Sequence, residues 1–152
     1  MKTKNLYWLL LSSSFIYSQN SEPIQADRPD QTETPAIVPK GMFQVETGLV
    51  FQKNDANSST FSLPSTLWKY GVNENFELRL LTEFVSEAIN YTKTSGLNPI
   101  YVGFKVLLTE EKGIVPKTSC IAQIGFPNAA SSPYKTAYFA PEFRLVMQHS
   151  LS

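Results

Sequence analysis

The sequence predicts an all-β protein, and more specifically an antiparallel up-and-down transmembrane β-barrel with about six strands present. Three observations support this fold class. Apolar and polar residues alternate with a period of two along six segments. No apolar run beyond the N-terminus reaches the 18 or more residues of a membrane-spanning helix. Long and short connections alternate between the segments, as they do in outer-membrane barrels.

The first residues read as a secretory signal peptide over residues 1–18. Lys2 and Lys4 precede an apolar run at residues 6–17, and the small residue Ser18 follows it. As a helix the run would cover only ~18 Å, against a hydrocarbon core of roughly 30 Å, so a retained anchor helix is the weaker alternative. We predict that the mature chain begins at Gln19, which mass spectrometry of the exported protein can check.

Composition argues against several classes of function. The 13 basic and 13 acidic residues balance, so no basic stripe is present to neutralise nucleic-acid phosphates. Cys120 is the one cysteine and falls on an apolar face, where it should be an inert small hydrophobe. His149, the one histidine, lies at a strand end, where we expect an exposed or interfacial role. With no Ser/His/Asp or Cys/His grouping, we expect neither an enzyme nor a cofactor.

Residues 19–41 form a Pro-rich segment that we expect to lie in the periplasm. Its motif consists of Asp27, Arg28, Pro29, Asp30 and Glu33. The three acidic residues recur every third position, and carboxylates suit Ca²⁺ or Mg²⁺. However, prolines interrupt the run, and the glycine and ligand spacing of a calcium loop are missing, so we predict no metal site. The favoured alternative is that the carboxylates and Arg28 form hydrogen bonds to the barrel rim.

The strands are predicted within residues 42–152 from segments that alternate in polarity. These segments are residues 42–52, 66–72, 76–85, 100–108, 117–126 and 138–148. The alternation is weaker in 117–126, where Ile121 falls out of pattern. In all six, one face carries no Asp, Glu, Lys or Arg. The opposite face carries Glu46, Lys69, Glu77, Arg79, Glu83, Lys105, Lys117, Glu142 and Arg144.

Two architectures fit such a two-faced sheet. A soluble barrel hides the apolar face inside, whereas a transmembrane barrel turns it to lipid and keeps the charges in its lumen. Lumen charges can set the selectivity for small solutes. The alternative is a network of cross-strand ion pairs that fills a narrow barrel and conducts nothing.

The connections and the aromatic residues favour the membrane architecture. The predicted connections are 53–65, 73–75, 86–99, 109–116 and 127–137, which run long, short, long, shorter, long. This rhythm is typical of barrels with tight periplasmic turns and long outer loops. Aromatic residues near the strand ends would form an interfacial girdle: Phe43, Phe51, Trp68, Tyr70, Phe76, Phe84, Phe126 and Phe139.

Several motifs resemble those of a known family. They are ADRPDQTETP at 26–35, VPKGMFQVETG at 38–48, LWKYGV at 67–72, FELR at 76–79, and GFKV followed by LTEEKG within 103–113. In this order they resemble outer-membrane proteins of the putative MetA-pathway of phenol degradation family, from about Ala26 to Ser152. The resemblance implies a porin-like transporter in the outer membrane of a Gram-negative bacterium. Its solutes would be small compounds, hydrophobic or aromatic ones among them.

Six strands fall short of the eight found in the smallest bacterial single-chain barrels. We therefore expect the chain to be part of a larger barrel, with self-association into a homo-oligomer as the alternative. The expected partners are outer-membrane lipid and a small solute. Two other functions stay open, a soluble secreted barrel that binds a hydrophobic ligand and a non-conducting structural barrel at the cell surface.

Overall fold

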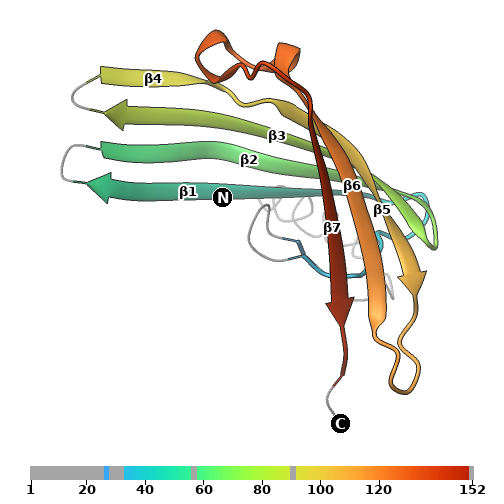
Figure 1. Cartoon of the computed structure of the whole chain (residues 1–152). Coiled ribbons are helices and arrows are strands. Elements are labelled where there is room, and N and C mark those ends of the chain that lie inside the picture. Colours follow the sequence, from blue (N-terminus) through green and yellow to red (C-terminus); the bar gives the residue numbers. More distant parts are fainter. Residues whose placement is uncertain (1–25, 28–32, 56–57, 90–91, 151–152) are drawn as a thin grey trace, which may run out of the picture.

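The computed structural model describes residues 26–27, 33–55, 58–89 and 92–150, so the predicted signal peptide lies outside the described residues. Its strands are β1 (Phe43–Asp55), β2 (Ser58–Asn73), β3 (Phe76–Ile89), β4 (Thr92–Leu97), β5 (Ile100–Thr109), β6 (Lys117–Phe126) and β7 (Ala140–Gln148). They form one antiparallel sheet in the order β1-β2-β3-β5-β6-β7, and β4 pairs with β3 (Figure 1). The predicted all-β antiparallel fold is confirmed.

The predicted loops at 53–65 and 86–99 are wrong, because most of both segments is strand. The β1–β2 pairing continues out to Asp55 and Ser58, and β3 pairs with the unpredicted β4 from Phe84 to Ile89. The sequence signal is weak here because Ser and Thr fill both faces, so no hydrophobic alternation marks these stretches even though β-branched Thr suits a strand. The count of about six strands missed β4 for this reason.

The other connections lie close to the predicted ones. A two-residue turn, Glu74–Asn75, joins β2 to β3, and the side chain of Asn73 accepts a hydrogen bond from the backbone N–H of Asn75 at 2.9 Å. Residues 110–116 join β5 to β6. Two short 3-10 turns, η3 (Pro127–Ala129) and η4 (Ser132–Tyr134), lie between β6 and β7.

The sheet bends sharply along its width. In Figure 1, β1–β4 run across the view while β5–β7 cross them steeply, and residues 33–42, drawn in blue, lie in the angle between these groups. Among the described residues, β1 and β7 are the two ends of the strand order and do not pair with each other. No helix in the described ranges is long and apolar enough to cross a membrane.

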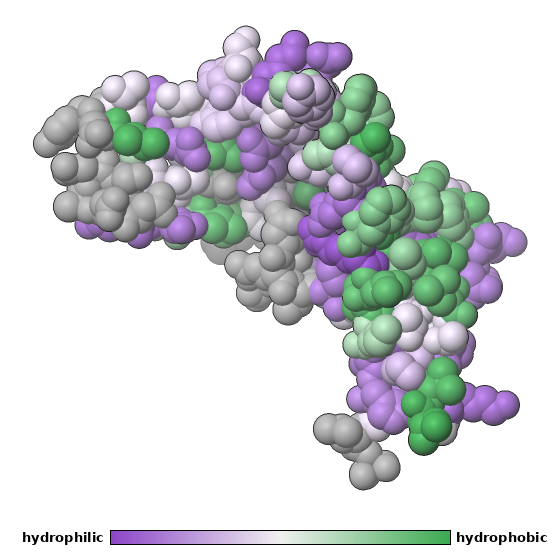
Figure 2. Space-filling model, viewed as in Figure 1, coloured by the Kyte–Doolittle hydropathy of each residue, from purple (hydrophilic) through white to green (hydrophobic). Residues whose placement is uncertain are grey.

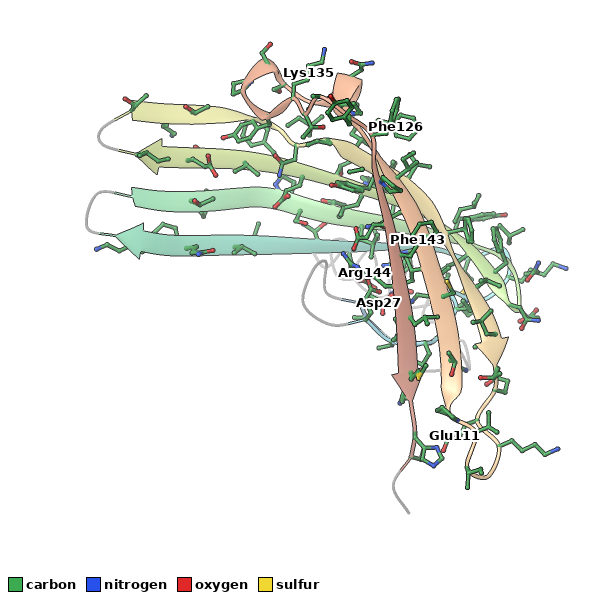
Figure 3. All side chains as sticks on the ribbon, viewed as in Figure 1. Asp27, Glu111, Phe126, Lys135, Phe143 and Arg144 are labelled. Atoms are coloured by element: carbon green, nitrogen blue, oxygen red, sulfur yellow. The ribbon has the colours of Figure 1, made fainter. Side chains whose placement is uncertain are left out.

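The two faces of the sheet are inverted relative to a water-soluble protein. Neighbours on one strand illustrate this: Phe143 of β7 is 75% exposed, whereas Arg144 points to the opposite side, toward Asp27 (Figure 3). Figure 2 shows hydrophobic side chains gathered over β5–β7. The exposed apolar residues of this face include Val45, Trp68, Leu78, Leu80, Val102, Phe104, Ile124, Leu145 and Met147. The buried side chains on the other face are largely polar or charged.

Candidate functional site

The N-terminal segment, described at residues 26–27 and 33–41, packs on the polar face of the sheet. Backbone hydrogen bonds tie its end to β2, since Gly41 N–H donates to Gly71 O at 2.7 Å and Gly71 N–H donates to Met42 O at 3.0 Å. The approach is so close that a Cβ added to Gly71 would lie 2.2 Å from the carbonyl oxygens of Val38 and Pro39. Glycine is therefore needed at position 71 for the segment to dock.

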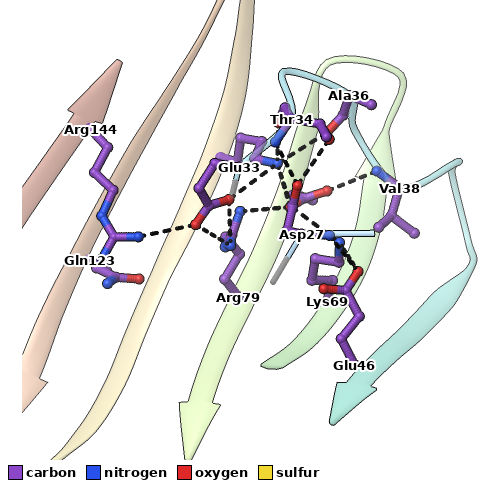
Figure 4. A network of polar contacts seen from close by, with 12 residues as sticks. Asp27, Glu33, Thr34, Ala36, Val38, Glu46, Lys69, Arg79, Gln123 and Arg144 are labelled. Atoms are coloured by element: carbon purple, nitrogen blue, oxygen red, sulfur yellow. Dashed lines mark hydrogen bonds and ion pairs between the residues drawn. The ribbon is translucent and has the colours of Figure 1, made fainter. Parts of the chain in front are cut away.

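Asp27 is the centre of the contact. Its side chain is 1% exposed, and its Oδ2 accepts hydrogen bonds from Lys105 Nζ at 2.8 Å, Lys69 Nζ at 3.2 Å and Arg79 Nη1 at 3.4 Å (Figure 4). Its Oδ1 accepts from the backbone N–H and the hydroxyl of Thr34, at 2.7 and 2.9 Å. Three strands, β2, β3 and β5, thus direct cations at one carboxylate.

Glu33 extends the contact to β7. Arg79 Nη2 lies 3.1 Å from both carboxylate oxygens of Glu33, and Arg144 Nη1 lies 3.2 Å from Oε1. The Nζ of Lys105 is 3.9 Å away. Glu33 therefore bridges β3 and β7 through Arg79 and Arg144, which lie 46 and 111 positions after it in the sequence.

The sheet's own carboxylates complete the network and also hold the segment's backbone. Glu46 pairs with Lys69 at 2.6 Å and accepts the backbone N–H of Asp27 at 3.1 Å. Glu77, 0% exposed, accepts the backbone N–H of Val38 at 2.8 Å and lies within 3.8 Å of Arg79 and Lys105. We call this set the ion network: Asp27, Glu33, Glu46, Lys69, Glu77, Arg79, Lys105 and Arg144.

Neutral contacts add to these ionic ones. Lys105 Nζ also donates to the carbonyl oxygens of Thr34 at 2.8 Å and Ala36 at 3.2 Å. The hydroxyl of Ser119 on β6 donates to Pro35 O at 2.5 Å. The segment therefore contacts β1, β2, β3, β5, β6 and β7.

The pKa values of Asp27 and Glu33, the described carboxyls of the segment, shift in opposite directions. Burial raises the pKa of Asp27, but attraction by Lys105 and Lys69 and the hydrogen bonds from Lys105 and Thr34 outweigh burial and bring that pKa well below its ordinary value. Burial also raises the pKa of Glu33, and there the attraction of Arg79 does not offset it, partly because Asp27 repels the second negative charge. Asp27 is thus the firmly ionised anion of the network.

The structure brings most of the predicted lumen-facing residues together. Glu46, Lys69, Glu77, Arg79, Lys105 and Arg144 are in the ion network, and Glu142 joins it through Arg144. Glu83 lies apart and accepts a hydrogen bond from Asn98 Nδ2 at 2.8 Å. Lys117 pairs at 3.1 Å with Glu110, which is 67% exposed.

Of the N-terminal motif, Asp27 and Glu33 are in the network, whereas Arg28, Pro29 and Asp30 lie outside the described residues. Instead of contacting a rim, Asp27 and Glu33 lie over side chains within the strands; Lys69, for example, is four residues before the end of β2. Sequence reasoning missed Thr34 and Ser119, because a single hydroxyl on a polar face carries no distinguishing pattern.

The remaining candidate residues, Cys120 and His149, lie outside the ion network. Cys120 pairs in register with Val106 and Leu145, both residues of the apolar face. His149 Nδ1 lies 3.4 Å from Glu111 Oε1, on a side chain that is 41% exposed. Within the described ranges no cluster of three or more His, Cys, Asp or Glu residues could hold a metal ion.

A family model described as "Putative MetA-pathway of phenol degradation" matches residues 26–151. This range contains the N-terminal segment and all seven strands. It agrees with the resemblance seen in the sequence motifs. Neither the curated proteins nor the solved structures include a match to the chain.

Proposed function

Because this chain belongs to the family described as "Putative MetA-pathway of phenol degradation", we propose that it is an outer-membrane β-barrel protein of a Gram-negative bacterium that admits small solutes passively. The family description favours hydrophobic or aromatic compounds among the solutes. The proposal involves no catalytic step. Its expected partners are the membrane lipid and the solute.

The inverted faces of the sheet carry this proposal. Phe143, Leu145 and Met147 on β7 are all more than 60% exposed, and similar side chains cover the same face of the other strands. Burying apolar surface is worth roughly 25 cal/mol per Å², so such a face is stable against lipid and costly in water. A soluble barrel that binds a hydrophobic ligand would need this face inside, where the N-terminal segment and the ion network lie instead.

The polar face suits passage of small solutes without strong selection by charge. The ion network has four carboxylates and four cations, so its formal charges cancel. The N-terminal segment covers part of this face and would narrow the path. The same observation favours a second candidate, a structural surface barrel in which the segment closes the lumen and nothing passes.

Location and facing can be tested together through Cys120. The exported protein should pellet with outer membranes and need detergent for extraction. Because a thiol that faces lipid stays protonated, it should react slowly with an apolar membrane-permeant maleimide and not at all with a sulfonated one. A Cys120→Ser/Ser132→Cys variant, with its thiol in exposed η4, should react with both reagents. A freely soluble protein, or a Cys120 that reacts equally with both reagents, would contradict the proposal.

Conductance separates the two candidates. Protein purified from its host's outer membrane should conduct in planar bilayers, and Gly71→Ala should raise the conductance because the added Cβ displaces the N-terminal segment locally, around Val38 and Pro39. Gly48→Ala is the matched control, since its Cβ would meet nothing nearer than Ser65 O at 3.9 Å. Folded protein that stays silent in all three forms would favour the non-conducting barrel.

A further inference from the structure

A second feature of the polar face is a cavity of about 300 Å³ beyond the ion network. It lies between β3, β5, β6, β7 and η4, on the side away from the Glu74–Asn75 turn. The lining residues that matter chemically are Glu83, Asn98, Tyr101, Gln123, Tyr134 and Glu142. This volume is at the lower end of the usual range for ligand sites and therefore suits a small molecule.

The hydrogen bonds within the wall occupy one N–H of each amide and the hydroxyl of Tyr134, and they leave acceptor sites on both carboxylates. Asn98 Nδ2 donates to Glu83 Oε2 at 2.8 Å, and Gln123 Nε2 donates to Glu142 Oε2 at 2.7 Å. The hydroxyl of Tyr134 donates to the backbone carbonyl of Thr94 at 3.2 Å. Carboxylate, amide and phenol oxygens keep lone pairs in this arrangement, so the wall is best matched by a ligand that donates hydrogen bonds.

Glycines fix the two aromatic rings. A Cβ on Gly125 of β6 would lie 2.8 Å from the ring of Tyr101, and one on Gly96 of β4 would lie 3.1 Å from the ring of Tyr134. Both rings therefore rest directly against strand backbone. The cavity is held in shape by the sheet and not by mobile side chains alone, which favours binding through preorganisation.

The charges of the wall are negative. Glu142 is partly offset by Arg144, whose Nε contacts its Oε1 and whose Nη1 reaches Glu33. Glu83 has an amide partner, and among the described residues no cation pairs with it. Lys135 lies beside the lining residue Tyr134 but is exposed. An anionic ligand would meet repulsion here, whereas a cation would gain charge-assisted hydrogen bonds.

We propose that this cavity binds a small organic cation, whose ammonium group donates to Glu83 and Glu142 while its apolar part lies against Tyr101 and Tyr134. The carboxylates accept charge-assisted hydrogen bonds from the ammonium group, and the two rings pack against the apolar part, so both halves of the ligand gain from the site. The inference rests on the proposed function and narrows it, because the cavity shares the polar face along which a solute would pass.

Three probes of matched shape test the proposal: phenethylammonium, the neutral 2-phenylethanol and the anionic 3-phenylpropionate. Titration calorimetry on the full chain in detergent should give the tightest binding for the cation, by about tenfold over the alcohol, and none for the anion. Glu83→Gln should weaken cation binding about tenfold and leave the alcohol unaffected. Glu74→Gln, an exposed carboxylate in the β2–β3 turn, is the control and should change nothing.

Tyr134→Leu keeps the test decisive if Glu83→Gln does not fold. This loop variant should weaken the cation several-fold by removing the aromatic face. Equal binding of cation and alcohol, or an unchanged affinity in a folded Glu83→Gln or Tyr134→Leu variant, would overturn the inference. Absence of cation binding by a protein that fractionates with outer membranes and conducts would overturn the inference alone. Cation binding by a soluble, non-membrane protein would overturn the proposed function alone.

Discussion

At Asp27 a single carboxylate faces the cationic groups of Lys69, Arg79 and Lys105, and all four side chains are nearly inaccessible to solvent. Each buried charge has lost hydration worth several kcal/mol, which its partners must replace. The lost hydration of Asp27 is replaced by the three ion pairs together with hydrogen bonds from the hydroxyl and the backbone N–H of Thr34. The consequence is asymmetric: the intact cluster adds little net stability, whereas removing one member costs a great deal.

Asp27→Asn should therefore lower the free energy of unfolding by about 3–5 kcal/mol, because three buried cations lose their shared counter-charge. Denaturant unfolding of the protein in detergent measures the loss. Glu110→Gln is a suitable control, since its partner Lys117 is partly exposed and the pair should contribute less than about 1 kcal/mol. Equal effects of the two substitutions would show that Asp27 is not a centre of the contact.

Glu33 and Asp27 predict a specific dependence on pH. The folded-state pKa of Glu33 is raised by burial, so its contribution to stability grows as the pH falls through that pKa and is complete below the unfolded value. The pKa of Asp27 is depressed, so its contribution is present above its unfolded value, about 3.9, and is lost only in stronger acid. As the pH falls from neutral toward 4.5, the ordinary pKa of a glutamate, the wild type should gain stability relative to Glu33→Gln. Parallel pH curves for the two proteins would refute this assignment.

At the scale of the strand, the sequence predicted which residues share a face but not where the strands end. Alternation identifies facing because the apolar neighbours of a charged strand residue lie on the opposite face, as Leu78 and Leu80 do around Arg79. The Ser- and Thr-rich stretch at 92–95 has no such alternation, so β4 could not be recognised. Local sequence patterns could not predict that the N-terminal segment docks on the sheet, because Glu33 contacts Arg144, which lies 111 positions later in the chain.

The facing of β3 gives opposite predictions for two adjacent residues. Leu80 is on the exposed apolar face, so Leu80→Lys should cost about 2–4 kcal/mol if it meets lipid near mid-membrane. Leu81 lies on the polar face beside the cavity that contains Glu83, so Leu81→Lys should cost much less. Unfolding in lipid vesicles compares the two. A larger loss of stability at Leu81 would indicate that the apolar face points inward, as in a soluble barrel.

On the scale of the whole molecule, one short segment links strands that are far apart in the sheet. Through Asp27, Glu33 and Pro35 the N-terminal segment reaches Glu46 on β1, Ser119 on β6 and Arg144 on β7, across the bend visible in Figure 1. The side chains that would form the core of a soluble protein are few, because the buried apolar side chains in the described part of the chain are Val38, Leu67, Val85 and Ile121, with Pro35 and Pro127. The interior is therefore filled mainly by charged and hydrogen-bonding groups.

Removal of residues 26–40 should consequently destabilise the entire sheet. The deletion takes Asp27 and Glu33 away and leaves Lys69, Arg79, Lys105 and Arg144 facing only Glu46, Glu77 and Glu142, so we expect a loss of more than about 5 kcal/mol. Adding Lys69→Met and Lys105→Met to the deletion should recover part of it, since well-packed apolar groups can replace buried ions. The folded fraction in heat-modifiability gels and denaturant midpoints report both effects. If the deletion variant is as stable as the full chain, the segment does not stabilise the sheet. If the double substitution restores no stability, uncompensated charge is not the cause of the loss.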